Sequence, residues 1–201
     1  MTARSADLKT PLARLAFANL LTPRKNDQGK ERYDCTLIFP KDADISALKN
    51  AVLQVAKDEW GDKGETLLKS GAIKSPILDG DGPQGLNKKT GERWAGYEGS
   101  YFIRTGSMQR PKLVNKKLLP ITEADELYSG CYVYAVVQAY TWEHPSNGRG
   151  ISIGLSMLQV AKDGERLGGG GANPDAFFEK IDDEGDNPKP AGSDGAAALF
   201  G

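Results

Sequence analysis

Alternating apolar and polar residues predict a set of short β-strands. In YDCTLIFP (33–40), every second residue from Tyr33 to Phe39 is apolar, which is typical of a half-buried strand, and Pro40 can end it. Further strands are predicted in RLAFAN (14–19), SYFIRTG (100–106), CYVYAVVQAYTW (131–142) and ISIGLSMLQV (151–160). The last two flank the turn-prone HPSNGRG and form a predicted hairpin.

One principal helix is predicted in DADISALKNAVLQVAKDEWG (42–61). Ile45, Leu48, Val52 and Val55 recur at helical spacing, Asp44 can cap the start and Gly61 can end the helix. Because the strands do not alternate with helices, the pattern argues against βαβ units and a parallel sheet. We expect a mainly β, α+β fold in which five or six short strands form a small, OB-like β-barrel.

The strand at 131–142 has two chemically different faces. Its odd positions are small and mostly apolar, whereas its even positions carry four large rings around Gln138. Small residues rarely suit an exposed strand face, so we expect the odd face to pack inward and the rings to be accessible. The opposite orientation, with the rings in the core, is the alternative.

The segment from Gly85 to Pro120 combines positive charge with aromatic rings. Eight basic and two acidic residues give it a net charge of +6, and Trp94, Tyr97, Tyr101 and Phe102 lie among them. Cations that neutralise phosphates and rings that stack on bases together favour single-stranded nucleic acid as a ligand. A solvated basic loop whose rings pack inward is the alternative.

We therefore predict a basic, aromatic groove for single-stranded DNA. The expected phosphate contacts are Arg104, Arg110, Lys112, Lys116, Lys117 and Arg149. The expected stacking surfaces are Trp94, Tyr101, Tyr132, Tyr134, Tyr140 and Trp142.

Charge divides the 201 residues into a basic body and an acidic end. Seven acids and two bases give residues 172–201 a net charge of −5, so the rest of the chain carries +4 of the total −1. Because GGGGANP follows Leu167, we expect a binding domain at 1–167 and a flexible joint with a disordered acidic tail at 168–201. A tail that serves only solubility is the alternative. Expected partner-binding residues in the tail are Asp182, Asp183, Glu184, Asp186, Leu199 and Phe200.

The sequence offers little for catalysis. His144 is the only histidine, and Cys35 and Cys131 lie far apart in strand patterns, where we expect buried, reduced thiols. Asp79 and Asp81 in LDGDGPQG could hold a divalent cation, but turns formed by the Asp-Gly pairs explain the same residues. We expect no enzymatic activity, cofactor or metal. A metal-dependent nuclease is the third hypothesis, after single-stranded DNA binding and a protein-interaction domain.

No apolar run approaches the roughly 20 residues that a membrane helix needs, and the N-terminus lacks the apolar region of a signal peptide. We therefore expect a cytoplasmic protein without a membrane partner.

Several stretches resemble a family of tailed-phage and prophage proteins. They are YDCTLIFPK, SPILDGDG, YFIRTGSMQRPKLVN, ELYSGCYVYAVVQAYTW and GISIGLSMLQVAKDGERLGG, and the likeness covers roughly residues 10–180. Its most specific pieces are YSGCY, SMQRPKLVN and the GLSMLQ…DGERLGG segment. The family is described as single-stranded DNA-binding proteins of the OB-fold kind, encoded near replication and recombination genes.

This resemblance implies a five-stranded barrel with a DNA groove, no enzymatic activity and a location in the host cytoplasm. Phage and bacterial single-strand binders typically end in an acidic tail with a terminal aromatic residue, whereas Phe200 is penultimate here. The expected partners are single-stranded DNA and, through the tail, replication or recombination proteins, and homodimerisation is left open. The alternative is a protein-interaction or virion-associated β-domain that uses its aromatic face as a subunit interface.

Overall fold

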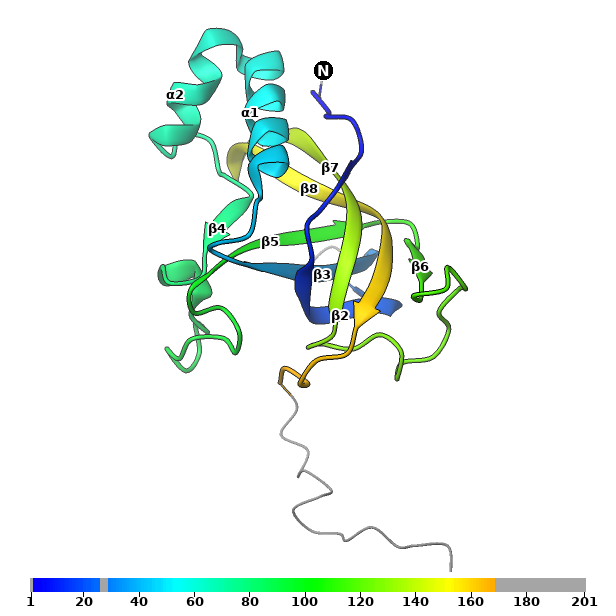
Figure 1. The fold of residues 1–201 in the computed structure, drawn as a ribbon. Coiled ribbons are helices and arrows are strands. Elements are labelled where there is room, and N and C mark those ends of the chain that lie inside the picture. Colours follow the sequence, from blue (N-terminus) through cyan, green and yellow to red (C-terminus); the bar gives the residue numbers. More distant parts are fainter. Residues whose placement is uncertain (1, 26–28, 169–201) are drawn as a thin grey trace, which may run out of the picture. The chain divides into compact units, whose positions relative to one another are not determined.

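The computed structural model describes residues 2–25 and 29–168, which contain eight strands and two α-helices (Figure 1). The strands are β1 Leu8–Lys9, β2 Ala13–Lys25, β3 Glu31–Pro40, β4 Ile77–Asp79, β5 Ser100–Ser107, β6 Lys112–Val114, β7 Tyr132–His144 and β8 Gly148–Lys162. The helices are α1 Ser46–Trp60 and α2 Gly64–Lys69, with 3-10 turns at Gly61–Lys63 and Pro83–Gly85. The predicted class, mainly β with one principal helix, is confirmed.

Five strands are joined in a closed ring of backbone pairings. β2 pairs with β3, β3 with β5, β5 with β8 and β8 with β7, and β7 returns to β2 at the pairs Ala13–Val133 and Arg14–Tyr132. The β5–β8 pairing is parallel and the other four are antiparallel. Outside the ring, β1 pairs with β7, β6 with β8 and β4 with β5.

The main core lies inside the ring and under α1. Leu15 of β2, Leu37 of β3 and Ile103 of β5 are completely buried there. Helix α1 contributes Leu48, Val52 and Val55, the face that its sequence predicts, and it packs on β7 (Figure 1). The Asp44 carboxylate accepts the N–H of Ser46 at 2.9 Å, and Gly61 ends the helix at φ 60°.

The orientation expected for β7 is confirmed. Val133, Ala135, Val137 and Ala139 are buried in the core, and the rings at the even positions are partly exposed. Cys35 and Cys131 are buried and free, as expected. Burial raises the pKa of both thiols, so they stay protonated at neutral pH.

The structure contains elements that the alternation does not predict. Strand β1 precedes the predicted strands. The strand predicted at 14–19 is β2, which runs to Lys25 rather than ending near Asn19, because β2 and β3 stay paired as far as Lys25–Glu31. Helix α2 and strands β4 and β6 lie in stretches too short or too polar to show a period. Among the described residues, no helix has the length and apolar character that crossing a membrane requires.

Candidate nucleic-acid interface

The outer face of β2, β3 and β5 changes from apolar to polar along the strands. At one end, Ala16, Ile38 and Phe102 form a buried outer cluster with Tyr97, which reaches the sheet from the loop at 80–99. Towards the β2–β3 hairpin, cross-strand pairs place Thr36 beside Arg104, Asp34 beside Gly106 and Arg24 beside Arg32. This sheet face therefore has a dry half covered by a loop and an open half rich in hydrogen-bonding groups.

A pocket of about 540 Å³ occupies this open half and is called the Trp94 pocket below. Phe17, Trp94 and Tyr97 supply its aromatic lining. Its positive charge comes from Arg24, Arg32 and Arg104, and its polar lining includes Asn19, Asp34 and Thr36. Rings that can stack on bases and guanidinium groups that can bind phosphates thus surround one cavity.

Phe17 is held in an unfavourable backbone conformation at the rim of this pocket. Its φ is +51°, at an irregularity in the pairing of β2 with β3 between Ala16 and Asn19. The side chain is 43% exposed, and its ring meets Trp94 edge-on, with the ring centroids 4.9 Å apart. An exposed ring on a strained backbone is more typical of a residue that binds a ligand than of a residue with a purely structural role.

The arginines of the pocket are fixed by specific neighbours. Arg24 binds the Asp34 carboxylate at 2.5 Å, and Asn19 donates a hydrogen bond to the same carboxylate at 2.9 Å. Arg32 lies over the backbone of Gly106, where a β-carbon would come within 2.8 Å of the Arg32 Nε. Glycine at position 106 therefore leaves room for the Tyr33 carbonyl oxygen, 2.7 Å from the same place, and for the Arg32 guanidinium above it.

A second pocket of about 410 Å³ adjoins the first at Trp94 and Arg104. Its other lining residues come from 83–89 and include Lys88 and Lys89, both exposed. Arg104 also donates to the carbonyl of Gln84 at 3.4 Å. The cationic surface thus extends from the hairpin arginines past Trp94 to two lysines.

The loop that carries Trp94 is tied to the sheet by a charged clasp. The Lys41 ammonium binds Asp81 at 2.6 Å and Asp79 at 3.1 Å, and Asp81 also accepts the N–H of Gly99 at 2.9 Å. The Asp81 N–H and Lys41 lower the pKa of Asp79, and Lys41 and the Gly99 N–H lower the pKa of Asp81. Arg93 donates to the carbonyl of Gly80. These two aspartates, considered above for a cation, bind a lysine.

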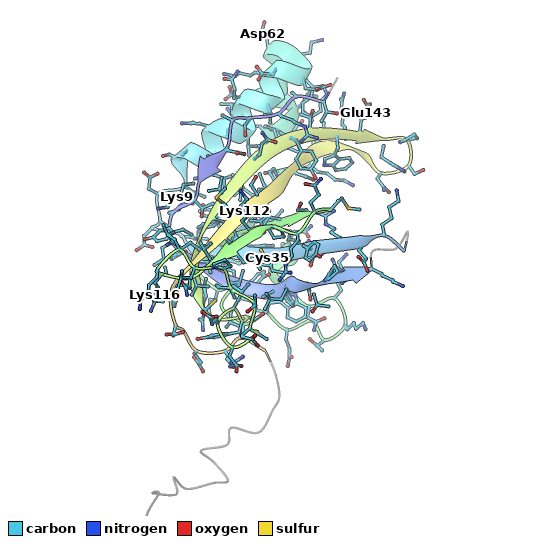
Figure 2. The ribbon with its side chains drawn as sticks, turned by 90° about the vertical axis from the view of Figure 1, so that its right-hand side faces the viewer. Lys9, Cys35, Asp62, Lys112, Lys116 and Glu143 are labelled. Carbon is cyan, nitrogen blue, oxygen red and sulfur yellow. The ribbon has the colours of Figure 1, made fainter. Side chains whose placement is uncertain are left out.

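The four predicted rings of β7 form a separate surface, and each has a cation beside it. Arg4 lies 5.5 Å from the Tyr140 ring, Lys9 4.4 Å from Tyr134, Lys74 5.6 Å from Trp142 and Lys162 4.4 Å from Tyr132. Glu143, labelled in Figure 2, lies at the end of this strand, and Arg149 pairs with it across the hairpin.

The remaining predicted residues lie in three places. Lys112 lines a pocket with Lys9 and Tyr134, on the part of the surface where Figure 2 labels both lysines. Arg110, Lys116 and Lys117 are exposed in the segments around β6. Tyr101 packs partly against the main core near Lys41 and Lys49.

Of the predicted residues, the structure brings Trp94 and Arg104 together in the Trp94 pocket. It brings Lys112 and Tyr134 together in another pocket and keeps the four rings of β7 on one face. Phe17, Asn19, Arg24 and Arg32 also line the Trp94 pocket, and sequence reasoning missed them. The basic, turn-prone TPRKNDQGKE was a usable signal for Arg24, and no alternation pattern could have found Phe17.

The chain was also compared with known proteins. The family model for the single-stranded DNA-binding protein of Enterobacter phage Enc34 matches residues 6–187. Protein p50 of Acyrthosiphon pisum secondary endosymbiont phage 1 is 29% identical over 184 residues, which cover 88% of this chain and 92% of that protein.

Solved structures show the same fold. The Enc34 single-stranded DNA-binding protein in complex with single-stranded DNA superposes with a TM-score of 0.61 at 26% identity, covering 81% of this chain and 89% of that one. The single-stranded DNA-binding protein gp2.5 of bacteriophage T7 has a TM-score of 0.55 at 11% identity, covering 92% and 100%, and shows similarity of fold alone. The fold is accordingly the OB-like fold of these single-strand binders. Because the family model covers most of the sequence, the chain belongs to the Enc34 family of phage single-stranded DNA-binding proteins.

Proposed function

We propose that this protein binds single-stranded DNA, without enzymatic activity and largely without regard to sequence, during phage DNA replication or recombination. Membership of the Enc34 family and similarity to a structure solved with single-stranded DNA support this proposal. In this proposal the ring of five strands is an OB-like barrel, and residues 1–167 form the DNA-binding domain that contains it.

The observation that carries the proposal is the composition of the Trp94 pocket. Phe17 and Trp94 offer ring surfaces, and each base stacked on an aromatic ring contributes about 1–3 kcal/mol whatever its identity. Arg24, Arg32 and Arg104 supply charges for the phosphates between stacked bases. We propose that the strand passes through this pocket and continues towards Lys88 and Lys89.

The outer face of β7 can extend the path. Tyr132, Tyr134, Tyr140 and Trp142 lie partly exposed beside cations that make no ion pair within the described part of the chain. Such cations are available to phosphates. We propose that longer strands reach this face, where Arg110, Lys112, Lys116, Lys117 and Arg149 also contribute charge.

The predicted acidic tail, from residue 169 on, lies outside the described residues. We propose that its net charge of −5 repels phosphates and competes with DNA for the same cations. We further propose that Asp182, Asp183, Glu184, Asp186, Leu199 and Phe200 recruit replication or recombination proteins in the host cytoplasm.

One observation favours a second function, a protein interface on β6, β7 and β8. Val136 and Met157 line an apolar pocket of about 300 Å³ there, beside Leu118, which is 69% exposed. Exposed apolar area of this kind is typical of contacts between proteins, including a homodimer. Sedimentation of the wild type and a Met157→Lys variant tests this second function. A shared monomeric state would contradict a homodimer formed through this pocket.

Binding to labelled oligo-dT, measured by fluorescence anisotropy beside a duplex of the same length, tests the proposed function. We expect tighter binding of the single strand, with log affinity falling linearly with log salt by about 0.7 per phosphate contacted. Failure to bind oligo-dT at low salt would contradict the proposal.

A further inference from the structure

Two of the most specific sequence signatures meet in one substructure, namely YSGCY (128–132) and the first five residues of DGERLGG (163–167). Residues 163–167, called the strap below, leave β8 and run back along Tyr128–Gly130. The Gly164 N–H donates to the Tyr128 hydroxyl at 3.2 Å, and that hydroxyl donates to the Gly164 carbonyl at 3.1 Å. The Leu167 N–H donates to the Ser129 carbonyl at 2.8 Å.

The two segments touch so closely that only glycine fits between them. Gly130 has a φ of +119°, and a β-carbon there would lie 2.0 Å from the Glu165 carbonyl oxygen. The same carbonyl accepts a hydrogen bond from Arg14 of β2 at 2.9 Å, and the Arg166 guanidinium lies 4.3 Å from the Tyr128 ring. The strap is thus held by two neighbouring segments, Tyr128–Gly130 and β2, well beyond what ending a strand requires.

The strap ends on the loop that carries Trp94. Leu167 and Trp94 both pack on the outer cluster of Ala16, Ile38, Tyr97 and Phe102. A Leu167 methyl lies 3.5 Å from the place of a β-carbon on Gly96, two residues after Trp94. Leu167, Phe17 and Trp94 also line a common pocket of about 270 Å³, whose lining further includes Ala95 and Ser129.

We propose that the strap positions Trp94, and with it Phe17, for stacking on DNA, with Leu167 as the positioning residue. The inference rests on the proposed function. Trp94 is only partly buried, and its loop at 80–99 contains six glycines, so the indole needs support from outside the loop. Leu167 supplies that support without lining the Trp94 pocket itself. Single-strand affinity therefore depends on the side chain at 167.

The test uses full-length protein in which Trp60 and Trp142 are replaced by Phe, so that emission reports on Trp94. Leu167→Ala should shift the Trp94 emission to longer wavelength without DNA, because the indole loses its apolar neighbour. It should also raise the Kd for oligo-dT at least about threefold, but by less than Trp94→Ala does. Losing one stacked base costs about 5- to 150-fold in affinity, which sets the upper limit. Leu167→Met should restore both values.

Leu68→Ala is the matched control, because Leu68 is also a partly buried leucine but packs on the main core from α2. It should lower the urea midpoint while leaving the Trp94 emission and the Kd unchanged. Leu167→Val, a smaller truncation, serves if Leu167→Ala does not fold.

Unchanged emission and Kd in the Leu167 variants would overturn the inference, as would an equal loss of affinity in Leu68→Ala. Failure of the unmodified chain to bind oligo-dT would instead contradict the proposed function, and the emission shift would still test the packing of Trp94.

Discussion

Replacing Phe17 with glycine separates a binding role of this residue from a structural one. Phe17 combines a strained backbone with an exposed ring at the rim of the Trp94 pocket. Glycine adopts positive φ without strain, so Phe17→Gly removes the ring and the strain together. If Phe17 serves stability, the Phe17→Gly protein should be less stable than wild type. If Phe17 serves binding, the variant protein should lose only affinity for DNA.

The expected change in stability is small because its contributions oppose each other. Relief of the left-handed conformation contributes about 1–2 kcal/mol. The lost edge contact with Trp94 costs about 0.5–1.5 kcal/mol, and the greater freedom of glycine in the unfolded chain costs about 0.5–1 kcal/mol. We expect the free energy of unfolding to stay within about 1 kcal/mol of wild type. The affinity for oligo-dT should fall by about 1–3 kcal/mol, or about 5- to 150-fold.

Leu118→Gly is the matched control. Leu118 also has positive φ, at 62°, and is 69% exposed, but it lines the apolar pocket of β6, β7 and β8. Urea unfolding gives the stability of both variants, and anisotropy at one fixed salt concentration gives their affinity. We expect Leu118→Gly to be as stable as wild type or slightly more so, and to bind with unchanged affinity an oligo-dT too short to reach the β7 face as well. Wild-type binding by Phe17→Gly, or weaker binding by Leu118→Gly alone, would refute the assignment of the Trp94 pocket.

Other variants test the charges. Arg104→Gln should reduce the slope of log affinity against log salt by about 0.7 in an oligo-dT titration series, and an unchanged slope would remove Arg104 from the phosphate contacts. Deleting residues from Ala172 onward should tighten binding at low salt, with a gain that shrinks as salt rises, and equal affinities at low salt would leave the tail without this role. Because the pKa values of Asp79 and Asp81 are lowered, the clasp stabilises the loop fully above about pH 4 and loses this effect as pH falls through the lowered values. Trp94 emission should therefore change in acid, and Asp81→Asn should diminish that change; an identical acid response in this variant would contradict the clasp.

The sequence predicts the core of this fold well because strand and helix periods are set by burial. The odd face of β7 is small and apolar, and α1 carries one clear apolar stripe, so both orientations follow from the sequence. Alternation fails at Phe17, because it places this ring on the inner face with Leu15. One irregularity in β2 turns the ring outward, and nothing in the local sequence marks it.

For a related reason, the residues of the candidate site can be predicted from the sequence only in part. Positive charge is densest in the segment around β6, but β6 pairs with β8. The Trp94 pocket instead receives Arg24 and Arg32 from the β2–β3 hairpin, which the sequence presents as a polar turn. Charge along the chain identifies a ligand class, whereas strand register decides which cations meet at one cavity.

Fluorescence of three single-tryptophan proteins tests the central claim most directly. Trp60 ends α1, Trp142 lies on the outer face of β7 and Trp94 lines the proposed DNA pocket. In each protein the other two tryptophans are replaced by Phe, and emission is followed as a short oligo-dT is added. We predict strong quenching of Trp94 and unchanged emission of Trp60. Quenching of Trp142 with no response from Trp94 would contradict the claim that DNA binds on β2, β3 and β5.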